Sequence, residues 1–556
     1  MDGHALHVIP LADPREKPVA AADARHGDET AASVEIAVVV RPGVIDPPSV
    51  PQRAERTRDA VAAADGRTTI PVDFRTTGGR ALLVTARPLA PLRADVRDGW
   101  LAVGSDDADV MVPFGVLDAD GKGLVYGILR NGRWKRPLPA GAAKVLNLAT
   151  GETTAIPGAA DGGDRLEICM SGFSEAVRTE KGVLDLKAIG ADSASGIPWT
   201  DRATLDLFEK HGLKAVVNGL PNWFGGKTEL VGRMAELHPL SEFEAAAATW
   251  RMHPAIREVV VGDEPGKPDF AHYGKVFDLV REKMPGAVPN VPIFPDYGSH
   301  IARGDAEAKV QMGTDSYEDY VRSFCTLVPS ATSLKVDFYP YSAPAEKRAE
   351  YFGRRFSTMD VAARTAREFG KRLCLYVQCN SVFKDFKMTL PRMRYLAFTS
   401  LAYGARELNF TCYTPSWWKH NILDKKGNRT ARYEMVRQLI SELRAFDRAY
   451  MRFATTGTKV VGTFPAATAL GTLSAEDGGR IVVGEMTSPA GERALCIAGA
   501  DDPEGANVRI RQLTLKGADA IRVLTREGPV QPEKDAGGVW RLDLPSDGIL
   551  LVISGK

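Results

Sequence analysis

Apolar and polar positions follow three different rhythms along the chain. From Val34 to about residue 175, short apolar runs are separated by glycine, proline and aspartate, which is typical of short antiparallel strands. Turn sequences such as Asp120-Gly121 and Asn131-Gly132 lie between the runs and favour hairpins. We therefore predict an N-terminal β-sandwich over residues 34–175. Residues 1–33 have no periodic apolar pattern and are predicted to be a flexible leader.

Past residue 180, strand-like apolar runs alternate with segments of helical period. One helix is predicted from about Thr200 to His211, because Gly212 suits a C-terminal cap. Another begins at Asp269, which can cap it, and ends at Pro285-Gly286. Its apolar stripe consists of Tyr273, Val276, Phe277, Val280 and Met284. A closing helix from Arg432 to Tyr450 has a stripe of Tyr433, Val436, Leu439, Ile440, Leu443 and Phe446.

Seven strand-like runs alternate with the helices over about 275 residues. They occupy residues 184–192, 214–220, 257–265, 291–295, 333–341, 372–380 and 406–413. The run at 166–170 could supply an eighth strand. A (β/α)₈ barrel, the TIM barrel, typically has about 250 residues, whereas doubly wound sheets also alternate strands and helices. The number of strands and the length favour a barrel over residues 176–455.

From residue 456 onward the helical period disappears. Seven apolar runs separated by turns predict a second β-sandwich over residues 456–556. The predicted fold class is thus a multidomain protein with α/β and all-β parts. It consists of a (β/α)₈ TIM barrel flanked by N-terminal and C-terminal β-sandwich domains.

Composition narrows the classes of function. The 556 residues include 71 Lys and Arg against 70 Asp and Glu, which gives a net charge of +1. This balance argues against a nucleic-acid partner and against an acidic membrane surface. No apolar stretch approaches the roughly 20 residues that span a bilayer. We expect a cytoplasmic protein, or a secreted or periplasmic one if an export signal has been removed from the chain.

The cysteines predict neither a metal site nor disulfides. All six lie without the spacing of a zinc site, and most sit in apolar runs, as buried thiols do. The sequence also lacks a dinucleotide fingerprint, a complete phosphate loop and the signatures of serine hydrolases and zinc proteases. We therefore expect no cofactor and no metal. The sequence leaves the oligomeric state open.

Candidate chemistry follows from the barrel, because function sits at the C-terminal ends of its strands. Acids, amides and aromatics occupy the predicted strand ends, without lysine or arginine among them. Neutral sugars bind to such side chains, whereas phosphates and carboxylates favour basic groups. The candidates are Asp192, Asn218, Trp223, Asp263, Glu264, Asp296, Asp337, Tyr339, Gln378, Asn380, Tyr413, Trp417 and Trp418.

The clearest motif is Gly262-Asp263-Glu264-Pro265, which follows three β-branched residues of a buried strand. A carboxylic acid at a partly desolvated strand end tends to have a raised pKa, as a general acid needs. The motif resembles the N-E-P or D-E-P signature after the fourth strand of clan-A (β/α)₈ glycoside hydrolases, which include many β-galactosidases and β-glucanases. The resemblance extends in looser form over about residues 180–455. It implies that Glu264 is the acid/base and that Asp263 binds a substrate hydroxyl.

The chain departs from that family where its retaining members carry a nucleophilic glutamate after the seventh strand. The matching run offers the amides Gln378 and Asn380, which cannot act as carboxylate nucleophiles. We therefore predict that Asp337 is the second carboxylate, because it shares the inward face of its strand with Tyr339. Glu407 is a weaker candidate, since it opens its strand and would lie at the opposite end of the barrel.

The predicted function is hydrolysis of a glycosidic bond in a neutral oligo- or polysaccharide. Glu264 would be the general acid/base and Asp337 the nucleophile or general base. The separation of the two carboxyl groups would decide between retention and inversion. Two alternatives remain: a barrel that binds carbohydrate without catalysis, and a polysaccharide lyase. The sequence indicates neither the sugar and its linkage nor endo or exo action.

Overall fold

The computed structural model consists of two compact units, residues 1–163 and 164–556. Before residue 91 it describes the backbone of five strands. Beyond that point it describes residues 91–97, 100–106, 112–118, 121, 123–129, 132–137, 142–148, 152–156, 165–220, 223–224, 228–296, 305–381, 383, 386, 388–415, 418–476, 479–503 and 509–555.

The first unit contains three antiparallel sheets. One comprises β1 (His4–Val8), β2 (Ala22–Ala24), β3 (Val61–Ala62), β4 (Thr68–Phe74) and β5 (Leu82–Pro88). The second comprises β6 (Arg93–Arg97), β7 (Trp100–Gly104) and β10 (Arg133–Pro137), and the third β8 (Val112–Leu117), β9 (Gly123–Leu129), β11 (Lys144–Asn147) and β12 (Thr153–Ala155). Leu101 and Val103 of the second sheet share a core with Phe114 and Val116 of the third, as in a β-sandwich. β1 and β2 lie within the segment predicted to be a leader, so part of that segment forms strands.

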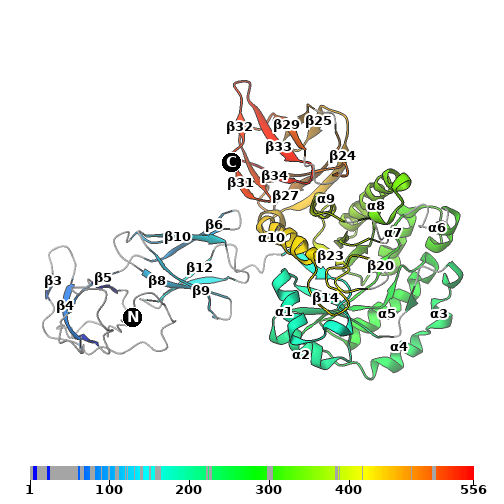
Figure 1. Cartoon of the computed structure of the whole chain (residues 1–556), viewed down its shortest axis with the longest axis horizontal. Coiled ribbons are helices and arrows are strands. Elements are labelled where there is room, and N and C mark those ends of the chain that lie inside the picture. The colour runs from blue at the N-terminus through cyan, green and yellow to red at the C-terminus, as the bar shows by residue number, and fades with distance from the viewer. Residues whose placement is uncertain are drawn as a thin grey trace. The chain divides into compact units, whose positions relative to one another are not determined.

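The second unit begins with a parallel sheet that closes into a barrel (Figure 1). Its strands are β13 (Glu167–Met170), β14 (Ser193–Pro198), β15 (Lys214–Asn218), β17 (Ile256–Val260), β19 (Val288–Asn290), β20 (Pro292–Ile293), β21 (Ser333–Val336), β22 (Arg372–Gln378) and β23 (Glu407–Thr411). β19 pairs with β17, and β20 pairs with β21. Because only Val291 separates β19 from β20, the two ends of the sheet belong to one segment, and the ring has eight strand positions.

Helices surround the ring in the order expected for a (β/α)₈ barrel (Figure 1). They are α1 (Glu180–Ile189), α2 (Arg202–Lys210), α3 (Met234–Leu237), α4 (Leu240–Ala247), α5 (Phe270–Lys283), α6 (Asp305–Met312), α7 (Tyr317–Leu327), α8 (Arg348–Glu368), α9 (Leu390–Ala402) and α10 (Ala431–Met451). The stripes predicted for α5 and α10 are buried. The run at 166–170 is confirmed as a barrel strand, and it is the first.

Two local predictions were wrong. The run at 184–192 lies largely in α1, because Val183, Leu186 and Ile189 recur every three residues behind the N-cap Thr179. The strand instead begins at Ser193. Asp269 does not cap α5 through its side chain; its carboxylate accepts hydrogen bonds from the amides of Gly232 and Met234, at 2.8 and 2.9 Å.

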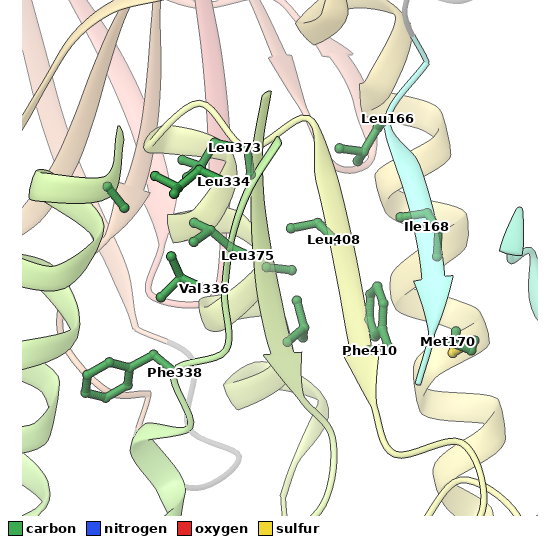
Figure 2. Close-up of a cluster of buried hydrophobic side chains, with 14 of the residues drawn as sticks. Leu166, Ile168, Met170, Leu334, Val336, Phe338, Leu373, Leu375, Leu408 and Phe410 are labelled. Atoms are coloured by element: carbon green, nitrogen blue, oxygen red, sulfur yellow. The ribbon is translucent and has the colours of Figure 1, made fainter. Parts of the chain in front are cut away.

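Alternate residues of the barrel strands form an apolar layer against the helices. Figure 2 shows this layer on four neighbouring strands, with Leu166, Ile168, Met170, Leu334, Val336, Phe338, Leu373, Leu375, Leu408 and Phe410. Since side chains alternate along a strand, the residues between them point into the barrel. Lys335 and Glu407 are therefore interior residues.

The interior at the N-terminal ends of the strands holds a buried ionic cluster. Lys335 Nζ lies 2.7 Å from Glu258 Oε2 and 2.6 Å from Glu407 Oε1. Arg257 pairs with Glu407 at 2.7 Å and also contacts Glu258 and Glu167. Burial raises the pKa of Glu407, but Lys335 and Arg257 outweigh it and bring that pKa down to about 2. We call these five residues the barrel floor; they include Glu407, so its prediction as an opposite-end residue is confirmed.

The chain ends in a second sandwich of two antiparallel sheets. One contains β24 (Ala454–Val461), β27 (Ile481–Thr487), β28 (Arg493–Gly499), β34 (Ile549–Ser554), β30 (Ile521–Thr525) and β31 (Gly528–Val530). The other contains β25 (Ala466–Thr468), β26 (Gly471–Ala475), β29 (Ile510–Lys516), β33 (Val539–Pro545) and β32 (Glu533–Lys534). Cys496 and Leu551 of the first sheet join the core of the barrel helices, so barrel and sandwich share one apolar core.

All six cysteines are free thiols; Cys412 is half-buried and the other five are buried. Among the described residues, no helix is both long and apolar enough to cross a bilayer.

Replacing Lys335 by Met should destabilise the protein strongly, because it removes one of the two cations that the buried Glu258 and Glu407 share and leaves Arg257 alone with both carboxylates. Breaking a buried pair in this way costs about 3–5 kcal/mol. Urea unfolding followed by tryptophan fluorescence measures the effect. The matched control is Lys210→Met, which removes an exposed pair with Glu180 (2.6 Å) and should change the free energy of unfolding far less, because solvent screens exposed pairs. Equal losses in the two variants would contradict the structural role of the floor.

Candidate active site

The Gly262–Gly266 turn connects the fourth barrel strand to α5. Gly262 lies against the ring of Tyr273, and a Cβ atom there would come within 2.3 Å of the tyrosine hydroxyl. A Cβ on Gly266 would meet Val231 Cγ1 at 2.6 Å and the Gln311 carbonyl oxygen at 2.9 Å. Both glycines are therefore required by close packing. They hold Asp263 and Glu264 at the C-terminal end of the strand.

Glu264 adopts an unusual backbone conformation, with a φ of +43°. Non-glycine residues rarely occupy this region, and such strain is concentrated at functional sites. Hydrogen bonds fix the conformation: the Glu264 amide donates to the Pro292 carbonyl at 2.9 Å, and Gln311 Nε2 donates to the Glu264 carbonyl at 3.0 Å. Tyr320 adds a bridge, since its hydroxyl donates to the Pro265 carbonyl at 2.6 Å and accepts from the Phe294 amide at 3.0 Å.

Asp337 follows β21 and points into the barrel. Leu334, Val336 and Phe338 belong to the outer apolar layer, so Lys335 and Asp337 share the inner face. Asp337 therefore lies two residues above the barrel floor, at the strand's C-terminal end. The alternation observed along β21 agrees with the inward orientation predicted for this carboxylate.

Asp263, Glu264 and Asp337 are close enough to affect one another's ionisation. Burial raises the pKa of Asp337 well above 3.8, and the negative charges of Glu264 and Asp263 raise it further, against a hydrogen bond with Tyr339. Burial also raises the pKa of Asp263 to about 6. Asp263, Glu264 and Asp337 are half-buried, and three carboxyl groups close together in a partly desolvated site cannot all ionise cheaply. Asp337 therefore ionises at a higher pH than an ordinary aspartate.

Asp296, at the end of the fifth strand, belongs to the same group. Asp296, Asp337 and Glu264 all contribute to raising the pKa of the buried Tyr317, after the larger effect of burial. Arg354 of α8 reaches Asp296, with 3.7 Å between Nη1 and Oδ1. The sequence analysis expected no basic group at the strand ends, so the Arg354 guanidinium, which comes from a helix, is an additional cation at the site.

The amide side chains of Gln378 and Asn380, at the end of the seventh strand, form hydrogen bonds with other parts of the chain. Gln378 is fully buried; its Oε1 accepts from the Tyr341 amide at 3.0 Å, and its Nε2 donates to Ser342 Oγ at 3.1 Å. Asn380 is also fully buried; in the orientation that satisfies its amide, the nitrogen donates to the Thr411 carbonyl at 3.1 Å and the oxygen accepts from the Cys412 amide at 2.9 Å. Both side chains hold loops at the C-terminal end of the barrel.

Three further candidates, Tyr339, Asn218 and Tyr413, differ in their surroundings. Tyr339 contacts Trp418, with ring centroids 5.0 Å apart, and hydrogen-bonds to Asp337. The half-buried Asn218 ends the third strand. Tyr413 is fully buried and stacks on Phe173.

Two tryptophans are only partly described, and one candidate lies elsewhere. The Trp223 backbone, in β16 (Trp223–Phe224), pairs with Gly262 in β18 (Gly262–Asp263). Trp417 lies outside the described residues. Asp192 precedes β14, at the opposite end of the barrel, where it pairs with Arg165 and Arg444. It is therefore not part of this carboxylate group, because the run before it is helical.

Sequence reasoning missed Gln311, Tyr317 and Tyr320, which surround Glu264 from α6 and α7. The only signal for them was indirect. Tyr317 and Tyr320 lie three residues apart on one helical face, and they would have been assigned to the core.

One group in the described chain has the composition of a metal site: Asp206, Glu209 and His253. The Ala255 amide donates to His253 Nδ1 at 3.1 Å, so the ring proton lies on Nε2, which faces Asp206 Oδ1 at 3.0 Å. A metal ligand nitrogen must be free of its proton. The geometry therefore favours a hydrogen-bonded histidine over a metal ligand.

Comparisons with known proteins give only loose structural likenesses. Neither a protein-family model nor a curated protein matches the chain. Among solved structures, a β-glucuronidase from Ruminococcus gnavus has a TM-score of 0.35 and 11% identity, over 65% of this chain and 70% of that one. A family 2 β-galacturonidase from Eisenbergiella tayi has a TM-score of 0.35 and 10% identity, over 65% and 73%. Bacteroides uniformis β-glucuronidase 3 has a TM-score of 0.32 and 10% identity, over 85% and 75%.

Replacing Asp337 by Asn should stabilise the protein at pH 8 but hardly at pH 4. Because its folded-state pKa is raised, the stability linked to protonated Asp337 is complete below its unfolded pKa and is lost as pH rises through the folded pKa. An amide avoids that loss. Thermal unfolding at both pH values measures the effect, with the exposed Asp543→Asn as control. If Asp337→Asn had a lower Tm than the wild type at pH 8, ionisation of Asp337 beside Glu264 and Asp263 would not be costly.

Proposed function

We propose that the chain is a glycoside hydrolase that acts through Glu264 and Asp337. The observation that carries the proposal is the raised pKa of Asp337 beside Glu264 and Asp263, at the C-terminal ends of the fourth and sixth strands. Glycosidic cleavage needs one protonated and one ionised carboxyl group on either side of the bond. A group of half-buried carboxyls in which the pKa values of Asp337 and Asp263 are raised supports this division.

The electrostatics favours one division of roles. The sequence motif suggested Glu264 as the acid, but burial and the charges of Glu264 and Asp263 raise the pKa of Asp337, so we assign the proton to Asp337. In this proposal, Asp337 protonates the leaving oxygen. Glu264 then acts as base on a water molecule or as nucleophile, in its strained and well-fixed conformation. Asp263 and Asn218 would bind hydroxyl groups of the substrate.

The substrate class follows from the charge of the site. Asp263, Glu264, Asp296 and Asp337 give it a negative character, and the Arg354 guanidinium already faces Asp296. An anionic sugar would meet these carboxylates unfavourably. A neutral oligo- or polysaccharide fits better, with Tyr339 and Trp418 as faces for its rings. The alternatives are a carbohydrate-binding barrel without catalysis and a polysaccharide lyase.

Glu264→Gln and Asp337→Asn should each lower kcat on a natural glycan by at least a hundredfold, because acid/base groups contribute about 10²–10⁴. Release of reducing sugar across a panel of neutral glycans measures this, with the exposed Glu434→Gln as control. Unchanged turnover in both variants would refute the assignment. Binding without release of sugar would favour the non-catalytic alternative, and unsaturated products would favour the lyase.

Activated aryl glycosides should separate the two roles. A dinitrophenolate leaves without protonation, so Asp337→Asn should retain most activity on such a substrate, whereas Glu264→Gln should lose it. The opposite pattern would restore the roles suggested by the motif. NMR of the first anomer released distinguishes retention, expected for carboxyls about 5–5.5 Å apart, from inversion at about 6.5–9.5 Å.

A further inference from the structure

The C-terminal sandwich contacts the barrel beside the candidate active site. Asp502 lies shortly after β28, and its Oδ1 accepts a hydrogen bond from the Tyr341 hydroxyl at 2.5 Å. The same oxygen lies 3.5 Å from Arg392 Nε of α9. Tyr341 is completely buried, whereas the Asp502 side chain keeps 19% of its exposure. A sandwich carboxylate thus reaches a buried tyrosine of the barrel.

Tyr341 belongs to a short turn that directly follows Asp337. This turn, which we call the Asp337 turn, comprises Tyr339 and the 3₁₀ segment Pro340–Ser342. The Ser342 amide donates to the Tyr339 carbonyl at 3.0 Å. Tyr339 in turn hydrogen-bonds to Asp337. The turn therefore fixes the side chain that contacts the proposed acid.

The Asp337 turn is fixed from two sides. Gln378 of the seventh strand binds the Tyr341 amide and Ser342 Oγ, at 3.0 and 3.1 Å. Asp502 binds the far end of the Tyr341 side chain. Arg392 strengthens this second attachment, since its guanidinium lies 5.4 Å from the centre of the Tyr341 ring.

We propose that Asp502 is a positioning residue for the barrel site and that the C-terminal sandwich is therefore part of the catalytic apparatus. This inference rests on the proposed function. Asp502 orients Tyr341, Tyr341 holds the turn, and Tyr339 of the turn orients Asp337. Gln378 takes part in the same arrangement, which explains a buried amide at this strand end.

Other contacts hold the sandwich against the barrel without touching the turn. Asp547 pairs with Arg394 of α9 at 2.8 Å and with Arg526 of the sandwich at 3.0 Å. Arg394 also pairs with Glu442 of α10. Asp547 is fully buried. It is therefore a matched control: a buried aspartate at the same domain contact, with partners outside the Asp337 turn.

The test compares Asp502→Ala and Tyr341→Phe with Asp547→Asn in the full chain. We expect kcat to fall about tenfold or more in the first two, because a misplacement of about 1 Å can cost a hundredfold. The pH–rate limb assigned to Asp337 should also shift. Asp547→Asn should lower Tm while kcat and the pH profile stay unchanged. Unaltered kcat and pH profile in Tyr341→Phe, which preserves the ring, would overturn the inference, even if Asp502→Ala failed to fold.

A second measurement needs no catalytic activity. The stabilisation by Asp337→Asn at pH 8 is measured in the wild-type and the Tyr341→Phe backgrounds. If the turn sets the surroundings of Asp337, the two values should differ, since coupled sites are not additive. Additive values would overturn the inference. Coupling in a chain that releases no sugar from any glycan would instead refute the proposed function and leave the positioning role intact.

Discussion

The buried charges of the barrel floor are the constraint on which the rest of the barrel depends. Glu258, Lys335 and Glu407 come from the fourth, sixth and eighth strands, and Arg257 links them to Glu167 of the first. Each charge needs its partners, because an unpaired ion in this interior is costly. A slip of one residue in any of these strands would turn its charge toward the apolar helix layer. The floor thus specifies the register of the strands.

Register at the floor determines what appears at the other end. Lys335 and Asp337 are alternate residues of one strand, and Glu258 precedes Glu264 on another. Attractive ion pairs fix these strands at their N-terminal ends. The same strands therefore place mutually repelling carboxylates at their C-terminal ends. The two ends differ in their electrostatics: the floor pairs cations with carboxylates, whereas the site gathers carboxylates that raise the pKa of Asp337.

The sequence predicted those parts that leave a local pattern. Apolar runs predicted the strands that contain Val259–Val261 and Leu334–Val336. The alternation of side chains predicted that Asp337 faces the barrel interior. Ser193–Pro198 was missed because it is made of small residues with Gly196 in the left-handed region. The φ of Glu264 and the contacts of Gln311, Tyr320 and Asp502 could not be predicted, since they join distant segments. Gln378 appeared to replace a nucleophile, yet its amide holds the Asp337 turn.

The interrupted fifth strand has a consequence for the candidate site. β19 pairs with the fourth strand and β20 with the sixth, and Val291 alone joins the two short strands. The carbonyl of Pro292, the first residue of β20, accepts from the Glu264 amide, so β20 also holds the turn that follows the fourth strand. The strand that precedes Asp337 pairs with the same two residues. One two-residue strand is thus the common support of both proposed catalytic carboxyl groups.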